Sequence, residues 1–300
     1  MKKLSIIILN YNTRDLLNEC LLSLKKVVNE VDFEIIVSDN GSTDGSLEML
    51  KQDFPDILVI ENQSNLGFAA GNNRVKSYVK GEYVLFLNSD TLMHANTLRE
   101  SIKYLEEHQD VGAMTCKMKL PGGELDKDAR RSFITPWIGL VHLFLKLDRI
   151  FPESKYFARY WYGFISPDIE HEVDVLQGAF LLTRKKVLDS IDWFDEDYFI
   201  DGEDIDLCWR IKEKGWKIIY YPKVTIIHIK GASKGKIESS LKEKVPLKER
   251  LKYRMAGVDS MEIFYRKRLW KKYPLILNLI VLVGIKFMKA LRFIKTLLLG

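Results

Sequence analysis

Cysteine is scarce in this chain of 300 residues, and its three cysteines lie far apart. Cys20, Cys116 and Cys208 show no CxxC spacing, which argues against a disulfide framework and against a zinc site built from cysteines. The chain also lacks internal repeats and low-complexity tracts. Its apolar share of 47% and charged share of 29% are typical of a globular protein and exclude a disordered one. We expect a protein of a reducing cytoplasm, large enough for one domain with an appendage.

Long hydrophobic runs are missing from the N-terminus. The opening MKKLSIIILNYN has a basic start, but its apolar run is short and is interrupted by Asn10 and Asn12. No small-residue cleavage site follows it. The segment therefore predicts a first strand rather than a signal peptide.

Charge is unevenly distributed along the chain. Residues 241–300 hold 15 Lys and Arg against 4 Asp and Glu, a net charge of +11. The remaining 240 residues hold 31 basic and 37 acidic residues, a net charge of −6. A mildly acidic body with a strongly basic tail indicates that the tail alone meets an anionic surface, either nucleic acid or membrane.

Short apolar runs alternate with helical patterns through the first half of the chain. Continuous apolar strands separated by helices are typical of a parallel sheet covered on both faces, which is an α/β fold. Ligands of such sheets bind beyond the carboxyl ends of the strands. The predicted strands cover residues 4–9, 34–39, 57–61 and 83–88, and the predicted helices cover 13–29, 46–52, a segment from about 69, and 95–108.

Polar side chains follow each of these strands where it ends. The segment YVLFLNSDTLMHANTL (83–98) shows it best, because a strand-like apolar run stops on Asn88, Ser89 and Asp90. One interpretation is a strand-to-helix turn that is capped at Thr91. The other is a ligand site, and four such clusters along one sheet edge favour it. The clusters are Asn10 to Asn12, Ser38 to Ser42, Asn62 to Asn65, and Asn88 to Asp90.

The stretch from about Leu120 to Val173 breaks the alternation of strands and helices. It is rich in aromatic residues, proline and arginine, among them Arg130, Arg131 and Trp137. Two interpretations remain open, a structural insertion and a region that shapes a substrate site.

Six carboxylates crowd into ten residues of the segment FDEDYFIDGEDIDLCWRIKEKGW (194–216). The pattern from Asp204 onward predicts an amphipathic helix that Gly215 ends. Capping of the helix N-terminus by acids explains one or two of the six. The others indicate a cation or a proton-transfer role, because packed carboxylates repel one another. The six are Asp195, Glu196, Asp197, Asp201, Glu203 and Asp204.

A histidine interrupts the apolar run VTIIHI, after two strand-like runs that surround Tyr221-Pro222. His228 is either a core residue or a ligand delivered to the same sheet edge as Asp90. A carboxylate, an imidazole and diphosphate oxygens together suit Mg²⁺ or Mn²⁺.

These stretches together resemble a family 2 glycosyltransferase of the GT-A fold, and most of all its bacterial rhamnosyltransferase-like branch. The resemblance implies a mostly parallel central sheet with helices on both faces, a Rossmann-like nucleotide-binding half, and basic amphipathic C-terminal helices. The matching stretches are SIIILNYN (5–12), IIVSDNGSTDGS (35–46), NLGFAAGNN (65–73), VLFLNSD (84–90), LQGAFLLTRKKV (176–187), FDEDYFIDGEDIDLCWR (194–210), the later His228, and DSMEIFYRKRLWKKYP (259–274).

The resemblance also implies a role for each matched residue. Tyr11 and Asp39 hold the nucleobase, with Asp39 accepting from a pyrimidine N3–H, and Asn65 lies in the loop that shapes the nucleotide pocket. Asn88 lies near the ribose, while Asp90 and His228 bind the metal. Asp204 is the catalytic base, and Glu203 precedes it in a Glu-Asp pair. Asn88 departs from the family's Asp-x-Asp, which leaves ribose contact and metal affinity open.

The implied reaction is transfer of a sugar from a nucleoside diphosphate to an acceptor hydroxyl, with inversion and with Mn²⁺ or Mg²⁺ as cofactor. A UDP- or dTDP-sugar, dTDP-rhamnose among them, is the expected donor, and a lipid-linked or polysaccharide glycan of the cell surface is the expected acceptor. An inactive nucleotide-sugar-binding relative is one alternative. A sugar-phosphate nucleotidyltransferase is another, although SIIILNYNTRD lacks the glycine-rich phosphate loop of that class.

Residues 1–238 are predicted to form the glycosyltransferase domain, with a nucleotide-sugar half (1–119) and an acceptor half (120–238). Residues 239–300 form a basic, apolar helical extension. Its run PLILNLIVLVGI (274–285) is shorter than the roughly 20 residues of a spanning helix. The cations beyond it are predicted to occupy the half of the helix opposite Phe287, Leu291, Ile294 and Leu298; these cations are Lys286, Lys289, Arg292 and Lys295.

This pattern predicts a helix that lies on an anionic membrane surface, on the inner, cytoplasmic face of the cell membrane. Lys267, Arg268, Lys271 and Lys272 are expected to add to the attraction. Packing on the protein's own domain, packing on a second subunit as in a homodimer, and a span over 275–299 remain open. Nucleic acid is disfavoured because so apolar a face would be left in water.

Overall fold

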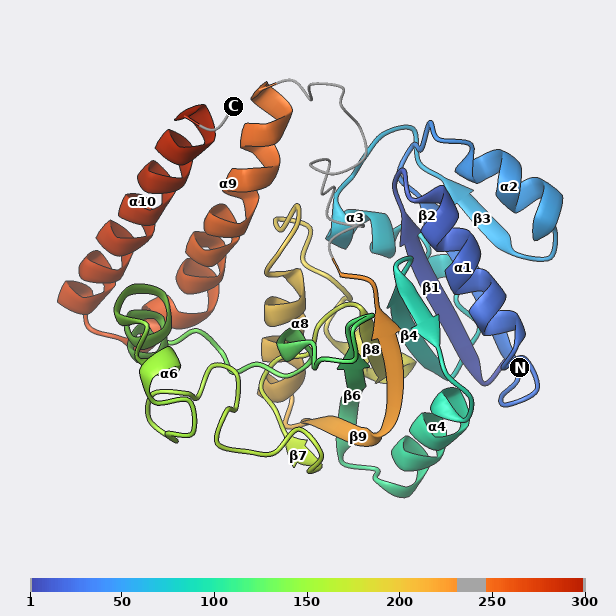
Figure 1. The fold of residues 1–300 in the computed structure, drawn as a ribbon, viewed down its shortest axis with the longest axis horizontal. Coiled ribbons are helices and arrows are strands. Elements are labelled where there is room, and N and C mark those ends of the chain that lie inside the picture. The colour runs from blue at the N-terminus through green and yellow to red at the C-terminus, as the bar shows by residue number, and fades with distance from the viewer. Residues whose placement is uncertain (1, 231–246, 299–300) are drawn as a thin grey trace.

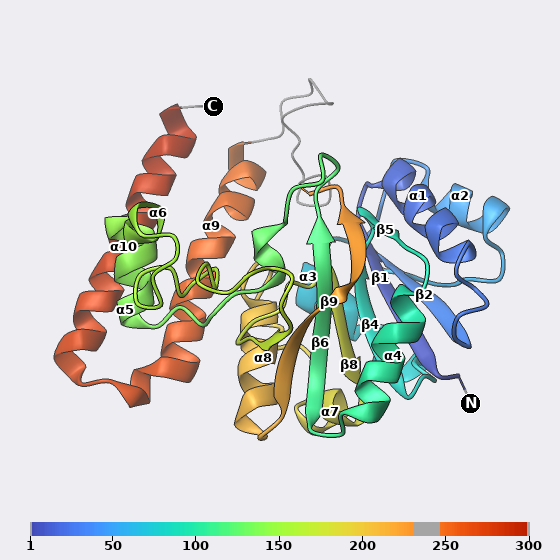
Figure 2. The ribbon, with the colours of Figure 1, turned by 60° about the horizontal axis from the view of Figure 1, so that its bottom comes forward.

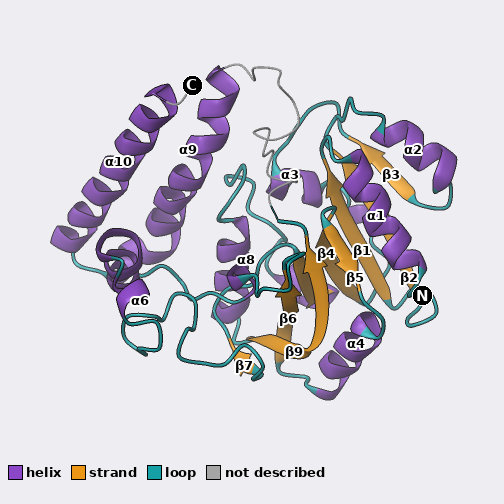
Figure 3. Cartoon of the chain, viewed as in Figure 1, coloured by secondary structure: helices purple, strands orange, loops and turns teal. Residues whose placement is uncertain are grey.

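The computed structural model of this chain describes residues 2–230 and 247–298. A single nine-stranded sheet runs through its body, and two long helices of the C-terminal segment stand side by side next to it (Figure 1). Colouring by secondary structure separates the two regions clearly, with the strands gathered in the body and only helices in the C-terminal part (Figure 3). The predicted α/β class is therefore confirmed, and the C-terminal segment is helical in its described part.

The first half of the sheet is wholly parallel, in the order β3-β2-β1-β4. Strands β1 and β4 are nearly continuous runs of buried apolar residues, as expected of a sheet covered on both faces, whereas no residue of the edge strand β3 is fully buried. The elements are β1 (Leu4–Asn10), α1 (Arg14–Lys25), β2 (Phe33–Asp39), α2 (Ser46–Asp53), β3 (Leu58–Glu61), α3 (Phe68–Asn73), the 3₁₀ turn η1 (Lys76–Tyr78), β4 (Tyr83–Asn88) and α4 (Thr97–Glu107).

The second half of the sheet mixes directions. Strand β8 pairs antiparallel with β4, β6 pairs antiparallel with β8, and β9 runs parallel to β6. Two short strands, β5 and β7, pair antiparallel with β9. The elements are β5 (Thr91–Met93), β6 (Val111–Lys119), β7 (His171–Glu172), β8 (Phe180–Arg184), α7 (Lys185–Ser190), α8 (Glu203–Glu213) and β9 (Lys217–His228).

Two local expectations from the sequence were wrong. Thr91 does not cap a helix, because Thr91–Met93 forms β5 against the end of β9, and α4 begins only at Thr97. The two runs around Tyr221-Pro222 form one strand, whose pairing with β6 shifts register between Cys116 and Lys117. That irregularity accommodates a proline, which has no N–H to donate to its neighbour.

The segment between β6 and β8 is irregular, as its sequence predicts. Its part over residues 136–157 lies against the C-terminal helices in two views of the molecule (Figures 1 and 2). Its short elements are the 3₁₀ turn η2 (Lys127–Ala129), α5 (Pro136–Gly139), the π-helical η3 (Leu140–Leu145) and α6 (Leu147–Ile150).

The C-terminal helices share an apolar core with the body. Tyr198 and Trp209, from the region of α8, pack with residues such as Val258, Phe264 and Leu282. The elements are α9 (Leu247–Phe264), the π-helical η4 (Tyr265–Leu269), the 3₁₀ turn η5 (Trp270–Lys272) and α10 (Leu275–Leu298). The division between 238 and 239 stays a prediction, and its boundary lies outside the described residues.

The basic and apolar faces of α10 are not oriented as the sequence predicts. Lys289 forms an ion pair with Asp259 of α9, and Arg292 donates to the carbonyl of Arg254. Half of the expected basic stripe therefore faces the protein, while the apolar half faces outward. In the described part of the chain, no helix has the length and apolar character needed to cross a membrane.

Candidate active site

Buried polar side chains form a hydrogen-bonded chain along the carboxyl edge of the parallel strands. Asn10 Nδ2 donates to Asp39 Oδ2 at 2.7 Å, and the Thr13 hydroxyl donates to Asn10 Oδ1 at 2.6 Å. The Ser89 hydroxyl lies 2.9 Å from that of Thr13. The sheet register produces this chain, because it aligns Asn10 with Asp39. The ends of β2, β1 and β4 are thereby fixed relative to one another.

Asp39 organises the turn that follows β2. Its Oδ1 accepts from the backbone N–H groups of Gly41 and Ser42, at 3.0 and 2.8 Å. The carboxylate is fully buried and already accepts three hydrogen bonds, so a nucleobase N–H would use its remaining acceptor capacity. Tyr11 lies at the same edge with an exposed ring, as a residue that packs against a base must.

Asn65 links the loop after β3 to the C-terminal helix α9. Its Oδ1 accepts from the Gly67 N–H at 2.9 Å, while its Nδ2 donates to the Tyr253 hydroxyl at 3.0 Å. The Tyr253 ring also lies against Phe199 of the acid-rich segment, with 5.8 Å between ring centroids. Tyr253 is therefore a candidate site residue that no sequence motif indicated.

We expect Tyr253→Phe to weaken nucleoside diphosphate binding about two- to tenfold, because one net hydrogen bond to the Asn65 loop is worth about 0.5–1.5 kcal/mol. Calorimetric titration with UDP and dTDP measures the change. Tyr78→Phe, an exposed tyrosine outside the site, is the matched control. Equal affinities of the two variants would show that Tyr253 has no part in nucleotide binding.

Asp90 and His228 meet at the same edge. The antiparallel pairing of β5 with β9 places Thr91 opposite His228, and the Ile229 N–H donates to the Asp90 carbonyl at 2.8 Å. His228 Nε2 lies 3.4 Å from Asp90 Oδ1, and both side chains are buried. His228 thus lies at the sheet edge that carries Asp90, and its role as a metal ligand stays a prediction.

The other nitrogen of the His228 ring is held by Asp126. Nδ1 lies 2.8 Å from Asp126 Oδ2, and Lys230 Nζ lies 2.6 Å from Asp126 Oδ1. Burial alone would lower the pKa of His228, but hydrogen bonds to Asp126 and Asp90 raise it to about 9. Burial alone would raise the pKa of Asp126, but hydrogen bonds from His228 and Lys230 lower it to about 2.

This pair has the donor set for a divalent cation whose other ligands come from a substrate. A carboxylate that orients the far nitrogen of a histidine is the usual support of a metal-binding imidazole. Mg²⁺ is commonly held by one or two protein ligands and by substrate phosphates. Among residues 2–230 and 247–298, no three His, Cys, Asp or Glu side chains gather around one metal position. Asp90 and His228 therefore fit a metal only together with diphosphate oxygens.

Glu203 and Asp204 form the first turn of α8, directly after Gly202, which adopts a left-handed backbone (φ 98°). Both carboxylates are largely buried, and Asp204 Oδ2 accepts from the guanidinium of Arg131. Arg131 is held in place by paired backbone hydrogen bonds with Val175. The charged partner of the predicted base is thus a cation from the irregular segment.

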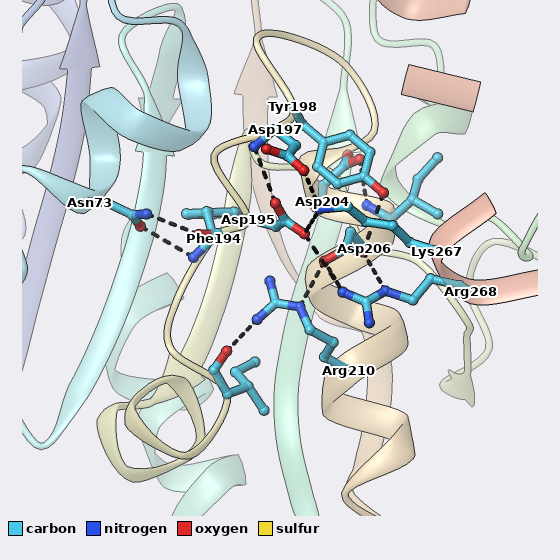
Figure 4. Close-up of polar contacts among 12 residues, drawn as sticks. Asn73, Phe194, Asp195, Asp197, Tyr198, Asp204, Asp206, Arg210, Lys267 and Arg268 are labelled. Atoms are coloured by element: carbon cyan, nitrogen blue, oxygen red, sulfur yellow. Dashed lines mark hydrogen bonds and ion pairs between the residues drawn. The ribbon is translucent and has the colours of Figure 1, made fainter. Parts of the chain in front are cut away.

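Two of the six crowded acids, and the nearby Asp206, are paired with basic residues of the C-terminal segment. Lys267 forms ion pairs with Asp195 and Asp197, and Arg268 Nε donates to Asp206 Oδ1 at 2.6 Å (Figure 4). One expectation from the sequence is thereby corrected, because Lys267 and Arg268 are engaged by acids rather than offered to a membrane. For Asp195 and Asp197, a lysine of the chain itself supplies a neighbouring cation.

The acid-rich segment also contacts the start of α3. The Phe68 N–H donates to the Phe199 carbonyl at 2.8 Å. Gly67 makes this approach feasible, because a Cβ there would lie 2.2 Å from the Phe199 oxygen. The loop after β3 and the start of α8 therefore border one site.

Comparison with solved structures identifies the fold. A mannosyltransferase from Pyrobaculum calidifontis, solved with GDP-Man and Mn²⁺, matches 98% of this chain and 73% of its own with a TM-score of 0.55 and 18% identity. TarS (1–349) from S. aureus, solved with UDP-GlcNAc, matches 86% of this chain and 66% of its own with a TM-score of 0.52 and 17% identity. The architecture is that of the GT-A glycosyltransferases.

Sequence comparison identifies the family. The profile described as "Glycosyl transferase family 2" matches residues 5–192. An N-acetylglucosaminyl-diphospho-decaprenol L-rhamnosyltransferase of Mycobacterium tuberculosis is 25% identical over 248 residues, 79% of each chain. The rhamnosyltransferase WbbL of Escherichia coli is 28% identical over 232 residues, 74% of this chain and 82% of WbbL. The chain belongs to glycosyl transferase family 2, and it resembles the rhamnosyltransferase branch.

Proposed function

We propose that this protein is a metal-dependent, inverting glycosyltransferase that moves a sugar from a nucleoside diphosphate to an acceptor hydroxyl. The observation that carries the proposal is the closure of the α8 segment, with Glu203 and Asp204, over a nucleotide edge that ends in Asp90 and His228. Tyr11, Asp39, Asn65 and Asn88 hold the nucleotide in this proposal.

Asp204 is the general base. Its carboxylate takes the proton of the acceptor hydroxyl while that oxygen bonds to the anomeric carbon and the nucleoside diphosphate leaves. A single displacement of this kind inverts the anomeric centre. Arg131 holds one Asp204 oxygen in place, and Glu203 lies beside it in the same helical turn. Asp90 and His228 would hold a Mn²⁺ or Mg²⁺ ion, which would supply positive charge to the departing diphosphate.

The rhamnosyltransferase relatives support a UDP- or dTDP-sugar as donor, with dTDP-rhamnose as the first candidate. One of them is named for an acceptor in which a sugar is carried on a decaprenyl diphosphate. A lipid-linked or polysaccharide glycan of the cell surface is the acceptor that this similarity supports. An enzyme with a lipid-linked acceptor works at a bilayer, so we place this one on the cytoplasmic face of the cell membrane.

Nucleotide release from a panel of nucleotide-sugars, with and without Mn²⁺, tests the function. We expect release from at least one pyrimidine nucleotide-sugar in the presence of metal, increased by a glycan acceptor. The panel includes UDP-, dTDP- and GDP-sugars, since the mannosyltransferase with the same fold was solved with GDP-Man. Nucleotide binding without any release or transfer would support the inactive relative instead. Diphosphate formation from sugar phosphate and a nucleoside triphosphate would support a nucleotidyltransferase.

Replacement of either proposed metal ligand should reduce the effect of Mn²⁺ on nucleotide binding. We expect Asp90→Asn and His228→Gln each to weaken Mn²⁺-dependent UDP or dTDP binding by about 10–100-fold or more, since loss of a supporting residue alone costs that much. Calorimetric titration with and without Mn²⁺ measures it. The exposed His94 offers the control His94→Gln. Unchanged metal dependence in His228→Gln would make His228 a structural residue.

A further inference from the structure

Two segments that are far apart in the sequence expose apolar side chains beside one another. We propose that they form one surface that docks on an anionic lipid bilayer, with the irregular segment as its second contact. This surface, called the interfacial surface below, comprises the outward residues of α10 and the exposed residues of 137–156. The inference rests on the membrane location proposed above and names the part of the protein that meets the lipid.

Helix α10 contributes a long apolar stripe. Leu282 and Ile285 are buried against the protein, whereas the side chains on the opposite side point to solvent. Ile276 is 76% exposed and Val283 is 68% exposed. The helix has 24 residues and is therefore about 36 Å long. Its exposed apolar side chains form a contiguous patch and not the isolated exposed residues that are common on protein surfaces. Its outward members are Leu275, Ile276, Leu279, Ile280, Val283, Phe287, Leu291, Ile294 and Leu298.

The irregular segment beside α10 also exposes aromatic and aliphatic side chains. Ile150 is 64% exposed and Tyr156 is 78% exposed. The two segments touch, since a Cβ on Gly284 of α10 would lie 3.3 Å from the Phe144 ring. Both views of the ribbon place α5 and α6 beside α10 (Figures 1 and 2). Further exposed members are Trp137, Leu140, Phe144, Leu145 and Phe151.

The charges that border this surface favour an anionic bilayer over a second copy of the chain. Helix α10 contains no Asp or Glu, and its Lys286 and Lys295 are exposed. In a dimer across this surface, these lysines would meet no carboxylate on the facing α10. Anionic headgroups would match them, and the neighbouring Arg149 and Lys155 as well. Of the two acids in residues 137–156, Asp148 is buried with its Oδ2 2.7 Å from His142 Nδ1, and Glu153 is exposed but outnumbered by the exposed cations beside it.

The mix of residues also suits the boundary between headgroups and acyl chains. Trp and Tyr are favoured at that depth, because each combines an apolar ring with a polar group that stays hydrated. An apolar helical stripe with flanking lysines binds in the plane of the interface. A single helix in the interface would allow the enzyme to rotate about the helix axis. Two separate contacts would fix the orientation of the enzyme on the bilayer.

Co-sedimentation with vesicles of phosphatidylglycerol and phosphatidylcholine tests the surface on the full-length protein. One variant changes α10 (Ile280→Asp with Val283→Asp) and another changes the irregular segment (Ile150→Asp with Tyr156→Asp). We expect each to lower partitioning by about tenfold or more, because two apolar contacts are replaced by charges that the headgroups repel. Val28→Asp, an exposed apolar residue near the end of α1, is the control and should partition like the unchanged protein.

A local readout comes from Trp137. Brominated lipid should quench part of the tryptophan fluorescence, and Trp137→Phe should remove most of that quenching. Normal partitioning of the Ile150/Tyr156 variant, or equal quenching in Trp137→Phe, would overturn the second contact while leaving α10 as the anchor. Normal partitioning of both variants would overturn membrane docking. A dimer in solution that the variants dissociate would make the surface a subunit interface and overturn the proposal.

Nucleotide release measured without vesicles keeps this test separate from the proposed function. The variants should release nucleotide at the rate of the unchanged protein, since their side chains lie outside the site. A protein that binds vesicles but releases no nucleotide from any nucleotide-sugar would refute the function and leave the surface standing.

Discussion

Asp204→Asn is expected to fold normally, to bind the nucleotide-sugar, and to lose sugar transfer by about 10²–10⁴-fold, the usual cost of removing a general base. The amide keeps the size of the side chain and can still accept one hydrogen bond from Arg131, so the start of α8 should keep its conformation. Initial rates of transfer, together with donor affinity by calorimetry, separate the loss of chemistry from a loss of binding.

Asp197→Asn is the matched control for this experiment. Asp197 belongs to the same acid-rich segment, but its side chain is exposed and pairs only with Lys267 in the contacts described here. We expect its transfer rate to stay near that of the unchanged protein. If Asp204→Asn also transfers sugar at a near-normal rate, Asp204 is not the base, and Glu203 in the same turn is the next candidate.

Asp206→Ala is expected to destabilise the fold by about 3–5 kcal/mol, the cost of breaking a buried ion pair by removing one partner. The Asp206 side chain is fully buried between Arg210 of α8 and Arg268 of η4, at 2.7 and 2.6 Å. The Tyr198 hydroxyl also donates to it, at 3.3 Å. Its removal leaves two guanidinium groups without their shared acceptor.

Urea unfolding followed by circular dichroism measures this loss. Asp197→Asn serves again as the control, with an expected change within about 1 kcal/mol, because exposed ion pairs contribute little. A loss below 1 kcal/mol for Asp206→Ala would show that the C-terminal helices do not depend on this contact. A loss of the expected size would show that the ion pair between α8 and η4 contributes to the stability of the fold.

The C-terminal region thus has two different relations to the rest of the protein. Helix α9 and η4 contact the segments that carry the proposed site, through Tyr253 at Asn65 and Arg268 at Asp206. Helix α10 instead presents its apolar stripe to the outside. Among the described residues of this region, Lys267, Arg268 and Lys289 form ion pairs within the protein, whereas Lys286 and Lys295 of α10 are exposed.

The first half of the fold and its polar edge could be predicted from the sequence. Four apolar runs became β1 to β4 within about a residue of the expected bounds, because strand formation there follows from local patterning and burial. The polar residues after each run then had to meet, since the carboxyl ends of parallel strands lie on one edge. Asn10, Asp39 and Ser89 illustrate this convergence.

The sequence alone determined the class of protein, the sheet edge that bears its site, and Asp90, His228 and Asp204 as candidates. Only the tertiary structure decided their partners. Thr91–Met93 became a strand because β9, more than 120 residues later, lies beside it, and that pairing brings His228 to Asp90. The other partners also come from segments that are distant in the sequence. They are Arg131 for Asp204, Asp126 for His228, Lys267 for Asp195, and Arg268 for Asp206. Local patterns encode which face of a segment is apolar, but a side chain's charged partner depends on which distant segments pack together, and no local pattern contains that information.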